Sequence, residues 1–236
     1  MNLKKKNSQM LILCGGRGKR MGNITNSIPK PLIRIGNRSI IEHKIRYYKT
    51  QGFDNFIFCL GYKSKKMQSF LRRKTSKSIY SDAGVNAGIL KRIFFAKKFI
   101  KNTTIISYGD TLAKINLKKL VKNHLGSKCL ITIVVAPIKN PFGLVNWDKK
   151  NKAISFEEKP FLNHYIGYAV ISPHIFRYIN KRTINLKDGN GIVEAIKKLI
   201  LKRQVNIYKF NKLQVTINSP EELNHARLNY KKYFTF

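Results

Sequence analysis

Three glycines follow the first apolar segment of the chain, in a turn that could bind an anion. Gly15, Gly16 and Gly18 come directly after the apolar residues 10–14, and the residues at positions 17, 19 and 20 are basic. Glycine lets the backbone approach a ligand closely, and successive N–H groups in a turn form a concave anion site. The segment predicts a phosphate-binding turn, although an ordinary tight turn would explain it if it stood alone.

This turn does not match two common phosphate-binding motifs. A P-loop requires Gly-Lys followed by Ser or Thr, whereas Gly18 and Lys19 are followed by Arg20. A dinucleotide fingerprint requires Gly-x-Gly-x-x-Gly, but Met21 stands where the third glycine is needed, and the next apolar strand ends in Leu60-Gly61 without an acid for a ribose. Both motifs are excluded here.

A lysine between two prolines follows the glycine-rich turn. Pro29 and Pro31 are expected to hold the backbone extended and to place Lys30 rigidly between them. The pattern Gly-Gly-x-Gly-x-Arg at residues 15–20, followed by Pro-Lys-Pro-Leu at residues 29–32, closely resembles the signature of sugar-1-phosphate nucleotidylyltransferases. This family joins a nucleoside triphosphate (NTP) to a sugar phosphate and releases pyrophosphate.

The resemblance extends over most of the chain. Tyr-Gly-Asp at 108–110 closes an apolar strand, as the family's metal-binding Asp does, and Phe-Glu-Glu-Lys-Pro at 156–160 resembles its Phe-x-Glu-Lys-Pro motif. Ile-Gly-Tyr at 166–168 resembles the strand that follows. The segments that look most like the glucose-1-phosphate cytidylyltransferase branch are 82–84, 88–92 and 142–143.

The resemblance implies a role for each matching residue. It implies nucleotide binding by Leu13, Gly15, Gly16, Gly18, Asp82, Gly84 and Gly109. It implies sugar-phosphate binding by Gly143, Glu158, Lys159 and Gly167. A plain strand-to-helix turn would equally explain Asp82 and Gly84, and a surface ion pair would explain Glu158 and Lys159.

The implied reaction joins two polyanions, so it requires cations and N–H donors. A sugar-phosphate oxygen attacks the α-phosphorus of the triphosphate in line with the leaving pyrophosphate. The resemblance implies that Arg20 neutralises the pyrophosphate, and that Lys30 contacts the α-phosphate and the incoming phosphate. It also implies Mg²⁺ on Asp110, because this hard cation favours carboxylate and phosphate oxygens.

One position departs from the family pattern. Many relatives carry a second metal-binding Asp near the C-terminus, in a Trp-x-Asp-x-Gly-Thr-Pro setting. The Pro-Glu pair at 220–221 puts Thr216 where that Asp would be, and Asn218 is the nearest plausible metal ligand. Ser219 would cap the final helix in either case. Metal affinity and catalytic competence therefore depend on this segment.

Apolar strands and amphipathic helices alternate along the first 136 residues. Strands are expected at 10–14, 55–60, 78–81, 103–108 and 130–136, and helices at 40–50, 63–73, 88–99 and 117–124. Ser39 and Glu42 form the pattern of a capping box. This alternation favours right-handed βαβ units. We predict an α/β, Rossmann-like three-layer nucleotidyltransferase fold with a mostly parallel central sheet.

The pattern changes after Pro137. Strands at 142–147, 153–157 and 165–171 without helices between them predict an inserted small β region, partly antiparallel. Helices are expected at 173–180, 192–203 and 220–233, and a strand at 205–209. The chain shows no domain boundary, so we expect a single domain over 8–236 with a short basic N-terminal extension at 1–7.

The charge of the chain is extreme. Its 47 Lys and Arg residues exceed its 11 Asp and Glu residues, which gives a formal net charge of +36. The lysines are spread from Lys4 to Lys232, and Lys, Ile and Asn all have A/T-rich codons, so composition explains most of this excess. We expect no nucleic-acid partner. Because acids are so rare, each one deserves inspection.

Other features limit the location of the protein and its chemistry. Cys14, Cys59 and Cys129 lie in apolar runs without metal-ligand spacing, which is typical of reduced core thiols. We expect no membrane insertion, since no apolar run approaches ~18 residues, and no signal peptide, which together favour a cytoplasmic location. The five histidines lie near no catalytic constellation, and none receives a catalytic role.

Three functions remain open from the sequence. The first is a Mg²⁺-dependent transferase that uses an NTP, with CTP favoured, and a sugar 1-phosphate. The second, motivated by Thr216, is a catalytically weak homologue of such transferases with a nucleotide-sugar-binding or regulatory function. The third, motivated only by charge, is a nucleic-acid-binding protein, which predicts steep salt dependence. The sequence does not specify the oligomeric state.

Overall fold

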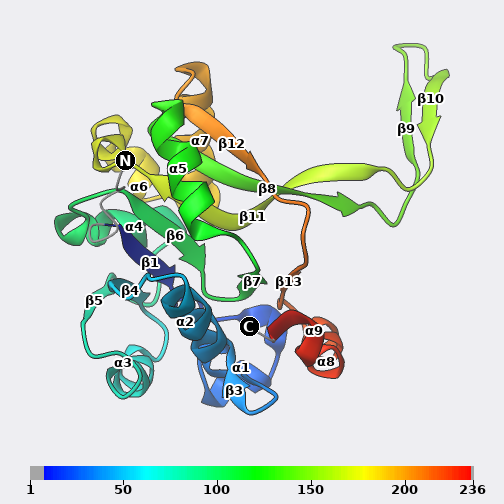
Figure 1. Cartoon of the computed structure of the whole chain (residues 1–236). Helices are drawn as coiled ribbons and strands as arrows, with labels where there is room; N and C mark the ends of the chain where they lie inside the picture. Colours follow the sequence, from blue (N-terminus) through cyan, green and yellow to red (C-terminus); the bar gives the residue numbers. More distant parts are fainter. Residues whose placement is uncertain (1–7, 235–236) are drawn as a thin grey trace.

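The structure is a computed structural model that describes residues 8–234, and it has three layers (Figure 1). The central layer is a seven-stranded sheet with the order β12 (Val205–Lys209), β8 (Ile131–Lys139), β11 (Phe161–Ile171), β6 (Thr104–Tyr108), β1 (Gln9–Leu13), β4 (Phe56–Leu60) and β5 (Ser78–Asp82). Within this sheet only β11 is antiparallel to its neighbours. The expected extension at 1–7 lies outside the described residues.

The alternation of side chains along the strands creates two cores. In β1, Met10 and Ile12 face one side of the sheet and Leu11 faces the other. The first side is covered by α2 (Ile40–Thr50), α3 (Ser64–Arg72) and α5 (Leu117–Ser127). The second is covered by α4 (Ile89–Phe95) and α7 (Asn190–Leu201), with α6 (Lys181–Ile184) beside them. The predicted α/β three-layer fold with a mostly parallel sheet is confirmed.

Most predicted elements occur within a few residues of their expected bounds, and three helices differ. The predicted capping box is present, because Ser39 N–H donates to Glu42 Oε2 at 2.8 Å and Ser39 Oγ accepts from Glu42 N–H. The helix expected at 173–180 is a 3₁₀ turn, Pro173–Tyr178. The helix expected at 88–99 ends at Phe95 and is followed by a 3₁₀ turn, Lys97–Phe99. The helix expected at 220–233 breaks at Asn229 into α8 (Pro220–Leu228) and α9 (Tyr230–Phe234).

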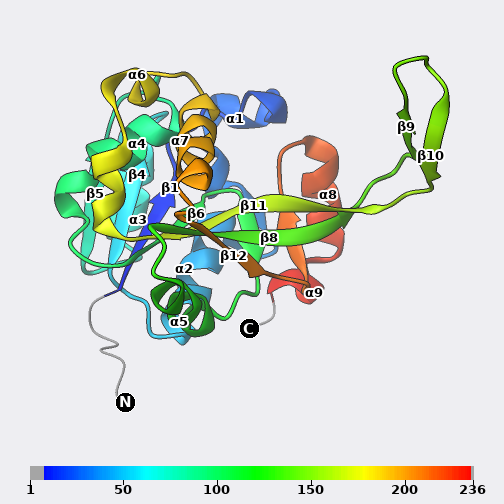
Figure 2. The same ribbon diagram turned by 90° about the horizontal axis from the view of Figure 1, so that it is seen from above.

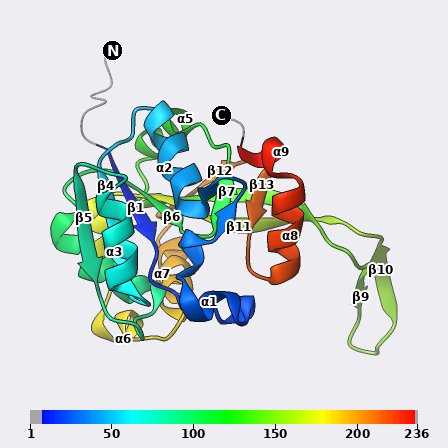
Figure 3. The ribbon, with the colours of Figure 1, turned by 90° about the horizontal axis from the view of Figure 1, so that it is seen from below.

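Several short elements that the sequence pattern does not predict pack together beside the main sheet. They are α1 (Ile24–Ser27), the hairpin of β2 (Arg34–Ile35) and β3 (Arg38–Ser39), and the antiparallel pair of β7 (Thr111–Ala113) and β13 (Gln214–Thr216). A third apolar cluster packs Leu223 of α8 with Met21, Ile33 and Leu112. Figure 3 shows α8 beside β13. The C-terminal segment is thereby held next to residues that follow β1 and β6.

The inserted β region is confirmed and forms a projection. The outer ends of β8 and β11 run past the sheet and carry the hairpin of β9 (Leu144–Trp147) and β10 (Ala153–Glu157) (Figures 1 and 2). We call residues 138–161 the arm. β11 begins at Phe161, four residues before the strand predicted from Tyr165, because its outer half pairs with β8 outside the core.

Candidate active site

The turn after β1 and the turn after β6 lie side by side. These strands are parallel neighbours, so their carboxyl ends meet at one edge of the sheet, where α/β proteins bind ligands. Gly109 N–H donates to the Leu13 carbonyl at 3.0 Å. A Cβ on Gly109 would lie 2.5 Å from that oxygen, so only glycine permits this approach. Asp110 is thereby held beside the glycine-rich turn.

Four predicted site residues from distant segments meet at this edge. Lys30 Nζ lies 2.7 Å from Asp110 Oδ2 and 3.3 Å from Asn218 Oδ1. Arg20 Nη2 donates to the same Asn218 oxygen at 3.0 Å. The Lys30 side chain is 9% exposed and that of Asp110 is 25% exposed, so the pair is screened less than a surface ion pair. The cluster holds two cations, one carboxylate and one amide oxygen.

Lys30 is positioned by a tight turn. Pro29 is extended, as predicted, but Lys30 itself begins a 3₁₀ turn, in which Leu32 N–H donates to the Pro29 carbonyl at 2.8 Å. The prediction of an extended backbone between the two prolines is therefore wrong at Lys30. Gly18 has a φ of +67° and packs on Lys30, with 3.3 Å between an added Cβ and the lysine Cβ.

Asn218, and not Thr216, lies in the cluster. The Ile217 N–H donates to the Asp110 carbonyl at 3.1 Å, which brings residues 216–218 to the site. Thr216 Oγ1 lies 3.1 Å from Thr111 Oγ1. The Asn218 N–H donates to the carboxylate of Glu222, the capping-box residue of α8. This cap orients Asn218 toward Lys30 and Arg20.

Arg92 of α4 packs beneath the glycine-rich turn. Its Nη1 donates to the Leu60 carbonyl at 2.5 Å, and its Nη2 donates to the Val85 carbonyl at 3.2 Å. A Cβ on Gly15 would lie 2.2 Å from Nη1, and one on Gly61 would lie 2.1 Å from it. Burial lowers the pKa of the guanidinium. The segment 88–92 was matched to the family, but the role of Arg92 in shaping the turn was not predicted.

Arg92→Lys is expected to raise the KM for the nucleotide about ten-fold, because a lysine cannot bridge both carbonyls and one hydrogen bond to a charged group contributes roughly 1.5–3 kcal/mol. The KM for the sugar phosphate should change little. Lys91→Met, which removes an exposed neighbouring charge, is the control. Steady-state kinetics with each substrate varied would contradict this role if both KM values rose together.

The other predicted nucleotide-binding residues follow the carboxyl ends of strands at the same edge of the sheet. Asp82 ends β5, and its Oδ1 accepts the Gly84 N–H at 2.9 Å. Gly84 has a φ of +85°, which suits a turn residue. Gly16 is exposed, and an added Cβ there would meet nothing within 4 Å. For Asp82 and Gly84 this geometry matches the turn interpretation, and base recognition remains a prediction.

The predicted sugar-phosphate residues divide into two groups. Gly167 lies at the core end of β11, where a Cβ would approach Tyr108 Cγ to 2.8 Å, so it is close to the Asp110 turn. Gly143, Glu158 and Lys159 lie on the arm. Glu158 and Lys159 form an ion pair of 3.2 Å with side chains 59% and 51% exposed. In the part of the chain that the structure describes, the hydrogen bonds and ion pairs of these arm residues stay within the arm.

A buried lysine lies behind the Asp110 turn. Lys44 of α2 is 1% exposed, and its Nζ donates to the Thr111 carbonyl and, at 2.9 Å, to Tyr168 Oη. Tyr168 Oη donates to the same carbonyl at 3.1 Å and accepts from Tyr48. This network fixes the residue that follows Asp110. Lys44 was not singled out by the sequence analysis. Its burial could have been inferred from its spacing, because Lys44 lies on the apolar face of α2 between Ile40 and Tyr48.

Two cysteines and one histidine lie in the core. Cys14 and Cys59 are buried free thiols, and burial raises the pKa of each, whereas Cys129 is half-buried. His124 bonds to Thr132 Oγ1 at 2.9 Å and to Ser172 Oγ at 3.0 Å, and burial lowers its pKa to about 4. That no cysteine or histidine is catalytic stays a prediction.

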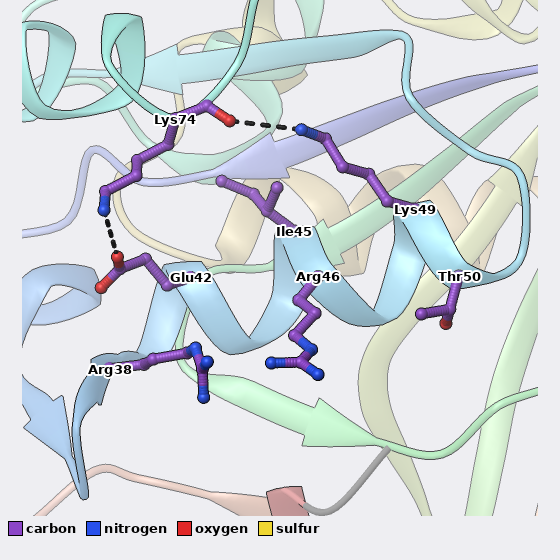
Figure 4. Close-up of a pocket in the computed structure, with 7 residues that line it drawn as sticks. All are labelled: Arg38, Glu42, Ile45, Arg46, Lys49, Thr50 and Lys74. Carbon is purple, nitrogen blue, oxygen red and sulfur yellow. Dashed lines mark hydrogen bonds and ion pairs between the residues drawn. The ribbon is translucent and has the colours of Figure 1, made fainter.

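One cavity has none of the predicted site residues in its lining. It has a volume of about 460 Å³ and lies on the outer face of α2 (Figure 4). Its lining residues are Arg38, Glu42, Ile45, Arg46, Lys49, Thr50 and Lys74. Glu42 and Lys74 are joined across it at 2.8 Å, and this pairing together with bonds from Ser39 lowers the pKa of Glu42 against the opposing effect of burial. The cavity is a shallow basic depression without the residues of the predicted site.

Metal-ligand groups and membrane-spanning helices were sought among the residues that the structure describes. Within 8–234, no group of three or more His, Cys, Asp or Glu residues is arranged to hold a metal ion. None of the helices in this range is long and apolar enough to span a bilayer.

Comparison with known proteins identifies the family. The model of the family described as nucleotidyl transferase matches residues 9–214. The probable glucose-1-phosphate cytidylyltransferase of Bacillus subtilis is 31% identical over 227 residues, covering 84% of this chain and 87% of the relative. The D-glycero-α-D-manno-heptose 1-phosphate guanylyltransferase of Campylobacter jejuni is 29% identical, covering 94% and 99%.

A solved structure supports the fold. HddC from Yersinia pseudotuberculosis, complexed with GMP-PN, superposes with a TM-score of 0.70 at 20% identity, covering 94% of this chain and 99% of that one. The predicted resemblance to sugar-1-phosphate nucleotidylyltransferases is confirmed, and the chain belongs to the nucleotidyl transferase family.

Proposed function

We propose that this chain couples an NTP to a sugar 1-phosphate and releases pyrophosphate. The observation that carries the proposal is the convergence of Arg20, Lys30, Asp110 and Asn218 beside the glycine-rich turn. A phosphate oxygen of the sugar attacks the α-phosphorus, and the bond to the leaving pyrophosphate breaks. Residues 8–236 would act as one catalytic domain.

The cations and N–H groups of the site have distinct proposed roles. The turn at Gly15, Gly16 and Gly18 cradles the triphosphate, and Arg20 neutralises the leaving pyrophosphate. Lys30 contacts the α-phosphate and the incoming phosphate. Each charge-assisted hydrogen bond of this kind contributes roughly 1.5–3 kcal/mol, and only bonds that strengthen in the transition state accelerate the reaction.

The donor set at the cluster suits Mg²⁺. Asp110 supplies carboxylate oxygens and Asn218 supplies an amide oxygen, both hard ligands, and magnesium sites in such enzymes combine one or two carboxylates with substrate phosphates. The ammonium group already beside Asp110 Oδ2 indicates that the carboxylate attracts a cation. Bound Mg²⁺ would neutralise phosphate charge, while Asp110 and Asn218 hold it.

For the sugar phosphate, we propose Gly167 at the core and Gly143, Glu158 and Lys159 on the arm. Gly167 is supported by its contact with Tyr108, next to Asp110. For the arm residues the support is the motif alone, and their use requires the substrate or the arm to bridge the distance to the cluster. We favour CTP because of the cytidylyltransferase-like segments and the Bacillus subtilis relative, and Asp82 and Gly84 would contact the base.

Asn218→Ala is expected to lower kcat/KM about ten- to hundred-fold, because two cations lose a shared acceptor and one such bond contributes roughly 1.5–3 kcal/mol. Thr216→Val, which keeps the side-chain shape, should change kcat/KM less than about three-fold, since its hydroxyl reaches Asp110 only through the long hydrogen bond of Thr111 Oγ1, 3.4 Å. The two variants are compared at several Mg²⁺ concentrations. A larger loss for Thr216→Val would place the second metal ligand at Thr216.

The proposed function is tested with a matrix of four NTPs against glucose, mannose and heptose 1-phosphates. Pyrophosphate release is measured with Mg²⁺, and the products are identified by mass. We expect the highest kcat/KM with CTP. Nucleotide binding by calorimetry without turnover of any pair would support the alternative of a catalytically weak homologue. That alternative was motivated by the missing acid at Thr216, and Asn218 supplies an oxygen in the cluster instead.

A further inference from the structure

The arm presents apolar side chains to solvent. Seven large hydrophobic residues within it are exposed: Ile138, Phe142, Val145, Trp147, Ile154, Phe156 and Phe161. Trp147 is 64% exposed, and Phe142, Phe156 and Phe161 are 67–74% exposed. Where exposed apolar side chains share one face, they mark an interaction site.

The hairpin is amphipathic. Phe156 pairs with Val145, and Trp147 is two residues along from Val145, so these three side chains share one face of the hairpin. Asn146 pairs with Ser155 on the opposite face, where Asn146 Nδ2 donates to Ser155 Oγ at 2.8 Å. The hairpin thus has an apolar face with no cover in the described structure and a polar face with its own hydrogen bond.

This hairpin also lacks support from the rest of the fold. β9 and β10 form a separate two-stranded sheet, and they stand away from the three layers (Figures 1 and 2). A two-stranded hairpin alone in water is marginally stable, and an uncovered apolar face adds a solvation cost. A partner on this face would remove both penalties.

We propose that the apolar face of the arm docks against the arm of a second copy of this chain. Aromatic side chains offer roughly 150–250 Å² each, so Trp147 and Phe156, which are 64% and 68% exposed on this face, bring roughly 200–350 Å² per copy. A standard interface buries roughly 800 Å² per partner. Val145 adds to the area of this face, which stays below the standard size, so we expect a weak, reversible dimer.

The charges of the arm favour a copy of itself over a polyanion. The arm carries five lysines and three of the eleven acids, Asp148, Glu157 and Glu158, whereas the rest of the chain carries 42 basic and 8 acidic residues. In a two-fold contact each carboxylate can face a lysine of the other arm. Because the arm projects, an arm-to-arm contact keeps the two cationic bodies apart, and salt weakens the repulsion that remains.

The test uses the only tryptophan of the chain, Trp147, as a reporter. For the full-length protein we expect sedimentation to show a dimer. On dilution, the fluorescence of Trp147 should shift to the red and acrylamide should quench it more strongly. Phe156→Ser is expected to raise the dissociation constant about 30-fold or more, since truncating a central aromatic residue of an interface costs roughly 2 kcal/mol or more. Leu201→Ser, at an 86% exposed residue of α7, is the control and should leave it unchanged.

Three outcomes would overturn the proposal. One is a protein that stays monomeric at a concentration on the order of 100 μM, with Trp147 accessible to solvent. Another is a dimer that Phe156→Ser leaves intact, because it would use another surface. The third is a monomer whose tryptophan emission shifts to the blue only with anionic lipid vesicles, which would assign the arm to a membrane surface. An unchanged far-ultraviolet circular dichroism spectrum of Phe156→Ser confirms that the variant is folded.

Discussion

Lys30→Met is expected to reduce kcat about 10³-fold, the upper range for loss of one preorganised donor to a developing charge. The side chain is 9% exposed and its Nζ lies 2.7 Å from Asp110 Oδ2 and 3.3 Å from Asn218 Oδ1, so its ammonium group is fixed in the cluster where we propose that the two phosphates meet. Methionine keeps the length and packing of the stem but removes the charge. Pyrophosphate release under saturating substrates measures the effect.

The matched control for this variant is Lys19→Met. Lys19 is an exposed lysine of the same segment, and its loss lowers the net charge by the same amount. On a chain of charge +36, general attraction of anions should hardly change when one charge is lost. If the two variants retained similar activity, Lys30 would be part of the background charge and the proposed site would be wrong.

Asp110→Asn is expected to lower kcat/KM on the order of 10³-fold, because a carboxylate that holds a metal ion against phosphate charge contributes several kcal/mol. The amide has the same shape but no charge, and it also loses the ion pair with Lys30. Calorimetry of NTP binding with and without Mg²⁺ gives a second readout. In the variant, the two affinities should become similar.

Asp54→Asn serves as the control for this second variant, since Asp54 is an exposed acid just before β4, at the opposite end of the strands. It should behave as the unmodified protein in both assays. A variant at Asp110 with normal Mg²⁺ dependence would show that the metal, if used, binds elsewhere.

The motifs predicted the centre of the site because its residues follow parallel strands. The patterns at 15–20, 29–32 and 108–110 come from segments whose positions a βαβ sheet determines, and the structure brings Arg20, Lys30 and Asp110 together. Asn218 was named as the nearest ligand without a geometric reason. The deciding feature is the unpredicted pair of β7 and β13, three residues each and too short to give a periodic pattern.

Two other features were not predicted, and only for Lys44 did the sequence hold a local signal, its spacing from Ile40 and Tyr48. Arg92 and Lys44 are basic residues in helices, where charge usually indicates a solvated face, yet both are buried and bond backbone carbonyls near the site. The extent of the arm was also not predictable, because the same alternation of residues in β8 and β11 continues from the core into solvent. Contact with a second copy would explain why apolar residues persist there.

The central claim is most directly tested by pyrophosphate release with CTP, glucose 1-phosphate and Mg²⁺, each omitted in turn. The account predicts release that requires all three, together with an equimolar nucleotide-sugar, and its loss in Lys30→Met but not in Lys19→Met. If CTP fails, the other three NTPs are tried with the same design. Release of pyrophosphate without a sugar phosphate, or none with any NTP and sugar 1-phosphate, would contradict the account.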